Sequence, residues 1–170
     1  ERYGMMSETT EFNGVDFKHI EFKILSLNEL PQMMAIERQS QYLPISASSM
    51  RDSLLASHHQ VWGIYRNFTA QLIGFGILSI LVDEAEITLM SVDPIYRRQG
   101  YGETLLLFMI DKAKEAKTEI LNLEVRRSNQ QAIKLYEKLY FEQVGLRKAY
   151  YQCRDSQEFE DALVYQLKLI

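Results

Sequence analysis

MSVDPIYRRQGYGETL, residues 90–105, is the stretch of sequence that decides the fold. An alternating strand pattern ends at Val92, and Asp93–Pro94 turns the chain. Gly100 and Gly102 then open a helical pattern. Several unpaired backbone amides point outward at such a helix start, and the helix dipole adds partial positive charge there. The segment therefore predicts a site for an anion such as a pyrophosphate.

The surrounding residues narrow the kind of anion site. Arg97 and Arg98 add formal positive charge, and the glycines let the backbone approach a phosphate closely. A glycine pair is also typical of an ordinary turn between a strand and a helix. The segment is not a Walker loop, because no G-K-[ST] follows. It also lacks the third glycine of the dinucleotide fingerprint, where Gly102 is followed by Glu103, a side chain that we expect to face solvent.

Working outward from this segment, hydrophobic periodicity gives the order βααβββαβαββ. The expected strands are residues 19–27, 61–67, 70–83, 84–92, 120–126, 142–151 and 161–170, and the expected helices are 28–41, 46–58, 100–116 and 129–140. We expect Asn28 to cap the first helix, and Ser128 with Gln131 to form a capping box before the last one. This order predicts an α/β domain with a mixed sheet and helices packed on it.

Composition excludes several classes of protein. The 170 residues suit one domain, and 46% apolar with 25% charged residues is wrong for disorder. No apolar run approaches the roughly 20 residues that cross a bilayer, and no secretory signal is visible, so a cytoplasmic protein is expected. We expect no metal site, because Cys153 is the one cysteine and His19, His58 and His59 lack metal-ligand spacing.

The ends of the chain give weaker signals. Residues 1–18 lack periodicity, and we expect a flexible lead-in there. Because Glu1 cannot initiate translation, Met5 or Met6 is the candidate start and residues 1–4 are a candidate expression remnant.

Two segments resemble a known family. VDPIYRRQGYG is similar to the acyl-CoA motif [QR]-x-x-G-x-[GA] of the GNAT superfamily of N-acetyltransferases, with Arg97, Gly100 and Gly102 in its three positions. LNLEVRRSNQQAIKLYEKLYF, residues 121–141, resembles L-x-L-E-V-R-x-S-N-x-x-A-x-x-L-Y-x-x-x-G-F of the RimI-type branch. That branch modifies the N-terminal alanine of a small-subunit ribosomal protein. The likeness departs at Tyr140, where the branch has glycine.

This resemblance implies a GNAT fold over residues 19–170, with a mixed, mostly antiparallel central sheet flanked by about four helices. It implies acetyl-CoA as the cosubstrate, with Asn129 near the thioester. The backbone of Met90, Ser91 and Val92 would bind the pantetheine arm. The remaining cofactor-binding positions implied around the pyrophosphate are Arg97, Arg98, Gln99, Gly100, Tyr101, Gly102 and Glu103.

The resemblance also assigns catalytic roles. Glu124 would be the general base and Tyr136 the general acid. Glu124 could take the proton from an attacking amine, and a phenol could protonate the leaving thiolate. By pattern alone, Glu124 is a solvent-facing strand residue and Tyr136 a core residue of a helix. We expect direct transfer, since Cys153 matches no family position that would carry an acyl group.

Three functions remain open at this stage. The first is acetylation of a protein N-terminus, with a ribosomal protein as the expected acceptor. The second is acetylation of a small amine or a lysine side chain, and the third is a non-catalytic acyl-CoA-binding sensor or subunit. The net charge of −4 argues against direct nucleic-acid binding but suits a basic protein terminus. The oligomeric state cannot be predicted from the sequence.

Three departures from the branch bear on these choices. Ile45 follows Pro44 where an aromatic residue is usual, and the loop 152–160 lacks a glycine. Both flank the expected acceptor groove. Tyr140 replaces a residue that normally ends a helix in the left-handed conformation, so we expect a different helix end there, with Tyr140 packed on the cofactor-side loop or lining a partner surface.

Overall fold

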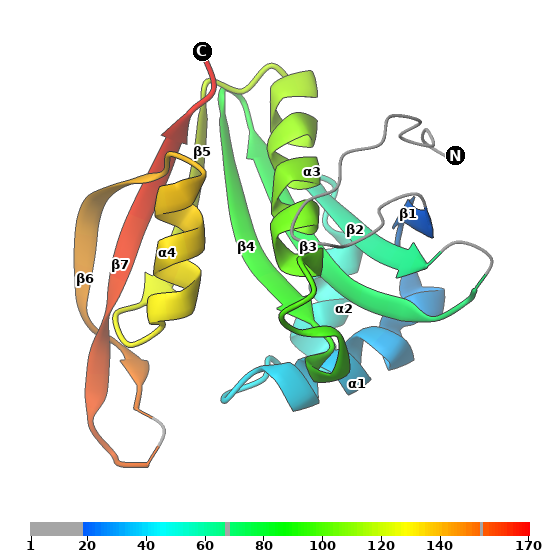
Figure 1. Cartoon of the computed structure of the whole chain (residues 1–170), viewed down its shortest axis with the longest axis horizontal. Coiled ribbons are helices and arrows are strands. Elements are labelled where there is room, and N and C mark those ends of the chain that lie inside the picture. The colour runs from blue at the N-terminus through cyan, green and yellow to red at the C-terminus, as the bar shows by residue number, and fades with distance from the viewer. Residues whose placement is uncertain (1–18, 67–68, 154) are drawn as a thin grey trace.

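A computed structural model describes residues 19–66, 69–153 and 155–170. The expected flexible lead-in, residues 1–18, lies outside the described residues. One sheet of seven strands runs through the molecule in the order β1-β2-β3-β4-β5-β7-β6 (Figure 1). The strands are β1 (Ile20–Ile24), β2 (His59–Arg66), β3 (Leu72–Leu81), β4 (Glu84–Val92), β5 (Ile120–Arg126), β6 (Glu142–Gln152) and β7 (Phe159–Lys168).

The helices connect these strands in the predicted order. They are α1 (Leu30–Ser40), α2 (Ala47–Leu55), α3 (Tyr101–Glu115) and α4 (Gln130–Lys138), with short 3₁₀ turns η2 (Leu27–Glu29) and η3 (Pro94–Tyr96). Only β4 and β5 pair in parallel among the described strands, and α3 makes the crossover between them. The expectation of a mixed, mostly antiparallel sheet with four helices is therefore confirmed.

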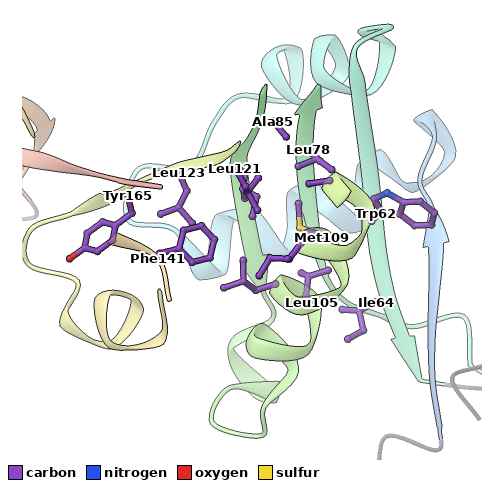
Figure 2. Packing of buried hydrophobic residues seen from close by; sticks show 14 of the residues in the cluster. Trp62, Ile64, Leu78, Ala85, Leu105, Met109, Leu121, Leu123, Phe141 and Tyr165 are labelled. Carbon is purple, nitrogen blue, oxygen red and sulfur yellow. The ribbon is translucent and has the colours of Figure 1, made fainter. Parts of the chain in front are cut away.

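The helices cover the sheet in two layers. Buried residues of α3 and α4 pack on one face, and those of α1 and α2 pack on the other. Figure 2 shows the first cluster, where Leu105 and Met109 of α3 lie against the sheet. A side chain at Gly76 of β3 would collide with the Met109 sulfur, so this glycine lets α3 approach the strand. Trp62, expected in the core, is buried here.

Several predicted element ends are wrong by a few residues, and two of them have a clear structural reason. The second helix ends at Leu55 and not at residue 58, because the chain turns and His59 already begins β2. The strand predicted over 70–83 ends at Leu81. Val82 has a φ of 56° and is 94% exposed, so it belongs to the tight turn before β4.

Both predicted helix caps are also wrong. Ser26, rather than Asn28, forms a capping box with Glu29 at the start of η2. Asn129, rather than Ser128, caps α4, with its Oδ1 accepting from the amide of Ala132 at 3.2 Å. Ser128 is used elsewhere: its hydroxyl donates to Glu160 Oε1 on β7 at 2.7 Å.

The expectation of a different end for α4 is also wrong. Tyr140 adopts the left-handed conformation, with a φ of 69°, in spite of its side chain. The amide of Phe141 donates to the Tyr136 carbonyl and that of Tyr140 to the Glu137 carbonyl, which is the Schellman pattern. The Tyr140 side chain is 83% exposed, so it is not packed on a neighbouring loop.

Among the described residues, no helix combines the length and the apolar character needed to cross a membrane.

Candidate active site

The sheet opens where β4 leaves β5. The two strands pair from Glu84 with Ile120 to Ile87 with Leu123, and the described pairing ends there. At the same point β4 carries an extra residue, Thr88, opposite β3, and such a bulge bends its strand. The halves of the sheet diverge beyond it (Figure 1). The backbone of β4 beyond Ile87 thus has no described strand beside it on the β5 side.

Two clefts adjoin this opening. The main cleft, about 720 Å³, lies between the α1–α2 loop, the divergent ends of β4 and β5, and the hairpin of β6 and β7. The α3 cleft, about 500 Å³, lies at the N-terminus of α3. Gln41, Met90 and Asn129 line both clefts, so the two are continuous.

The α3 cleft has the backbone geometry of an anion site. Gly100 is the N-cap residue with a φ of 84°, and no side chain caps the helix. The first-turn amides of α3 therefore stay available to a ligand. A Cβ at Gly102 would meet no atom closer than Val92 Cγ2 at 3.9 Å, so the space above this residue is open. A phosphate group fits this arrangement of amides and open backbone.

Two charged side chains of the α3 cleft, Arg97 and Glu103, are held by protein partners. Arg97 lines the cleft while its Nη2 donates to the Ser40 carbonyl of α1 at 3.0 Å. Glu103 is buried, and its Oε1 lies 3.0 Å from Lys138 Nζ of α4. The expectation that Glu103 faces solvent is therefore wrong, and Lys138 offsets its charge beside the anion site.

Ten of the eleven expected cofactor-binding residues line the α3 cleft: Met90, Ser91, Val92, Arg97, Arg98, Gly100, Tyr101, Gly102, Glu103 and Asn129. Gln99 lines neither cleft, and its side-chain amide donates to the Ile95 carbonyl at 3.4 Å.

A buried carboxylate that was not predicted from the sequence connects residues of the two clefts by hydrogen bonds. Glu37 of α1 is fully buried, and its Oε2 accepts from Ser91 Oγ at 2.9 Å. Its Oε1 accepts from the amide of Ile45 at 3.2 Å. Burial raises the pKa of Glu37, and these two hydrogen bonds oppose the rise. Glu37 therefore holds the α1–α2 loop against the divergent end of β4.

Gln41 completes this network. Its Nε2 donates to Ser91 Oγ at 3.0 Å and lies 3.4 Å from the Met90 carbonyl. A signal for Glu37 was present in the sequence: it follows Met33 by four residues and Met34 by three, and so lies on the apolar stripe of its helix. A carboxylate on such a stripe needs a buried partner.

Glu124 of β5 lies in the main cleft, where its side chain is 15% exposed. Arg147 of β6 approaches it, with Nε 2.9 Å from Glu124 Oε1. The pairing of β6 with β7 is interrupted by a bulge between Arg147 and Tyr151. On either side of it, Arg147 pairs with Ala162 and Tyr151 pairs with Glu160. The guanidinium of Arg126 lies 4.5 Å from the Tyr151 ring centroid on the same wall.

Tyr136 of α4 lines the same cleft as Glu124. Its ring packs near Phe141 and Tyr165, with centroid distances of 5.8 and 6.3 Å. Burial, with a smaller contribution from Tyr151, raises the pKa of Tyr136 to about 12. The phenol therefore keeps its proton at neutral pH and is able to donate it. The structure thus brings both expected catalytic residues into one cleft.

Comparison with known proteins decides the family. The sequence model of the acetyltransferase (GNAT) family matches residues 26–141. The chain belongs to the GNAT family of acetyltransferases. It is therefore an acyltransferase that uses acetyl-CoA, and the resemblance found in its sequence is confirmed.

Relatives place this GNAT protein more closely. It is 32% identical to the [ribosomal protein bS18]-alanine N-acetyltransferase of Escherichia coli K12, over 85% of this chain and 95% of that protein. It is 33% identical to the same-named Haemophilus influenzae protein, over 72% of this chain and 82% of the other. The crystal structure of the ribosomal-protein-S18-alanine N-acetyltransferase from Escherichia coli superposes with a TM-score of 0.82, covering 88% and 94% of the two chains at 31% identity.

The fold extends to more distant acetyltransferases. Arabidopsis thaliana NAA60 in complex with acetyl-CoA superposes with a TM-score of 0.76 at 17% identity, covering 88% of this chain and 98% of that one. At this identity the likeness shows the shared GNAT fold alone.

Proposed function

We propose that this GNAT protein acetylates a protein N-terminal α-amine, with the N-terminal alanine of ribosomal protein bS18 as its acceptor. The proposal comes from the relatives that carry this name and span most of the chain. The observation that carries it is the meeting of Glu124 and Tyr136 in one cleft that continues into the α3 cleft. One acetyltransferase domain over residues 19–170 would hold the whole reaction.

In this proposal, the two clefts divide the substrates. The α3 cleft takes the pyrophosphate of acetyl-CoA on the first-turn amides of α3, with Arg97 and Arg98 supplying positive charge. The edge of β4 on the β5 side, at Met90–Val92, takes the pantetheine arm as a strand would. The thioester then lies near Asn129, where the clefts join. The main cleft takes the acceptor peptide between the α1–α2 loop and the hairpin of β6 and β7.

Glu124 and Tyr136 act on the acceptor amine and the leaving sulfur. The neutral amine attacks the thioester carbonyl carbon, so that a C–N bond forms and the C–S bond breaks. Glu124 takes the proton that the amine nitrogen loses, directly or through water. Tyr136 gives its proton to the thiolate, and proton exchange with solvent resets both groups. An α-amine, with a pKa of about 7.7–8.0, makes smaller demands on this base than a lysine at about 10.4.

The walls of the main cleft bear on the choice of acceptor. Ile45 and Tyr42 line it from the α1–α2 loop, and Gln152 and Phe159 line it from the hairpin. These two segments contain two of the three departures from the branch. The side chains on these two walls would therefore determine which acceptor peptide fits best.

An acceptor screen with acetyl-CoA tests this function. Peptides beginning with Ala, Ser or Met are compared with lysine peptides whose N-termini are blocked, and with polyamines. The expected result is preference for the N-terminal alanine. Preference for a polyamine or a lysine side chain would contradict the proposed acceptor. Acetyl-CoA binding without acetylation of any amine would contradict catalysis.

Substitution of Glu124 tests the roles within the site. Glu124→Gln should lower kcat by about 10²–10⁴-fold while acetyl-CoA binding stays intact. Tyr136→Phe should also lower kcat, because no phenol remains to protonate the thiolate. Tyr140→Phe, on an exposed tyrosine at the end of the same helix, is the matched control and should retain full activity. Unchanged turnover in either catalytic variant would remove that residue from the mechanism.

A further inference from the structure

The main cleft contains a second carboxylate beside the expected general base. Glu86 of β4 pairs with Asn122 of β5, two residues before Glu124 along β5. Their neighbours Ala85, Leu121 and Leu123 belong to the core under α3. Glu86 and Glu124 therefore project from the opposite face of the sheet, and both line the main cleft. Glu86 lies where the two strands are still joined, at the narrow end of the opening.

The electrostatics of Glu86 connect it to Glu124. Partial burial raises the pKa of Glu86, the negative charge of Glu124 raises it further, and Arg147 opposes both effects. Glu86 as a whole residue remains exposed to solvent. The two carboxylates and the guanidinium of Arg147 thus form one cluster, with a formal charge of −1 when all three are ionised.

The two carboxylates of this cluster differ in their contacts with cations. Arg147 Nε contacts Oε1 of Glu124 at 2.9 Å, but no described cation lies within 4.0 Å of the Glu86 carboxylate. Asn122, beside Glu86, offers no charge, and its Oδ1 accepts from Gln166 Nε2 at 3.0 Å. Glu86 is therefore a carboxylate in the cleft whose charge lacks a contacting cation in the described structure.

We infer that Glu86 binds the protonated amine of the acceptor next to Glu124. The inference rests on the proposed function: the bound ammonium first releases one proton to solvent, the neutral amine then attacks the thioester, and Glu124 takes the second proton from its nitrogen. An α-amine is mostly an ammonium at neutral pH. One ammonium added to this cluster makes it formally neutral, which lowers the cost of enclosing the charges in the cleft. Arg147 contacts Oε1 of Glu124, which leaves Oε2 of that carboxylate available to the acceptor.

This role makes Glu86 a determinant of acceptor affinity rather than of the chemical step. Glu86→Gln keeps the shape of the side chain and removes its charge. We expect the acceptor KM to rise about tenfold, as loss of a hydrogen bond to a charged group would give. The expected kcat and the KM for acetyl-CoA stay within about twofold of the wild type, because Glu124, Tyr136 and the α3 cleft are unchanged.

The matched control is Glu84→Gln. Glu84 lies two residues earlier on β4, is exposed like Glu86, and does not line the main cleft. Its substitution removes the same charge from the same strand, and we expect an unchanged acceptor KM. An equal rise of KM in the two variants would show a general charge effect and would overturn the inference.

A peptide without its α-amine separates ammonium binding from structural damage. The best acceptor peptide of the screen and its desamino analogue are compared by isothermal titration calorimetry, without acetyl-CoA. In the wild type the amine should bind more tightly than the analogue, and Glu86→Gln should remove most of this preference. Equal weakening of both peptides would overturn the inference. A wild-type protein that acetylates no N-terminal peptide would contradict the proposed function first, and the role of Glu86 with it.

Discussion

Substitution of Gly102 gives opposite effects on stability and on cofactor binding. Gly102 lies in the first turn of α3 and lines the α3 cleft. A Cβ at this position meets only Val92 Cγ2, at an ordinary 3.9 Å. Gly102→Ala and Gly102→Val should therefore both fold. The acyl-CoA motif that this chain resembles admits alanine here, so alanine is the matched control and valine is the test of close backbone approach.

The magnitudes follow from helix propensity and binding linkage. Gly102→Ala should stabilise the ligand-free protein by about 0.5–1 kcal/mol, since glycine weakens a helix by that amount. Acetyl-CoA at 100 times its Kd stabilises the folded state by about 2.7 kcal/mol. A tenfold loss of affinity in Gly102→Val lowers this to about 1.4 kcal/mol at the same concentration. In a domain of this size, 1 kcal/mol corresponds to about 2–4 °C in Tm.

Thermal denaturation with and without acetyl-CoA measures both effects. The ligand should raise the Tm of the wild type and of Gly102→Ala by about 5–11 °C, but that of Gly102→Val by at most about 3–6 °C. Ligand-free Tm values at or above that of the wild type would show that both variants fold. A ligand-induced rise in Gly102→Val equal to that of the wild type would refute the placement of the pyrophosphate against this turn.

Two further predictions concern stability. Tyr140→Gly should stabilise the protein by about 0.5–1 kcal/mol in chemical denaturation, because relief of the left-handed strain outweighs the extra backbone entropy of glycine; a loss of stability would mean that the exposed ring makes a favourable contact. Burial raises the pKa of Glu37 above its ordinary 4.5, so wild-type stability should fall as the pH rises from about 4.5 through the raised value, and Glu37→Gln should lack this fall. Parallel curves for both proteins across that range would contradict the buried ionisation.

The types of the elements were predictable wherever the apolar period was clear. The strands Glu84–Val92 and Ile120–Arg126 have the bounds that the sequence indicated, because charged or polar residues alternate with core residues up to their ends. Helix starts were harder to place. Ser128 and Asn129 are both able to cap a helix, and the choice depends on Glu160, which offers Ser128 a partner 32 residues away.

The residues of the candidate site likewise divide into those that the sequence predicted and those that it did not. The glycines of the α3 cleft, with Glu124 and Tyr136, were predicted as site residues because a local motif carries them. Glu37 and Arg147 were missed because their partners, Ser91 and Glu124, are distant in sequence. The contact of Arg147 also depends on a bulge in β6, and the position of a bulge cannot be read from strand alternation.

The short pairing between β4 and β5 has a consequence for motion in this enzyme. Four residue pairs join the two halves of the sheet, and beyond Ile87 the edge of β4 has no described strand to shield it from water on that side. Amide hydrogens on that edge should exchange with solvent faster than those facing β3. A cosubstrate bound there acts as a removable strand. Acetyl-CoA would then slow this exchange. It would also bridge the two halves of the sheet, which otherwise pair only between Glu84–Ile87 of β4 and Ile120–Leu123 of β5.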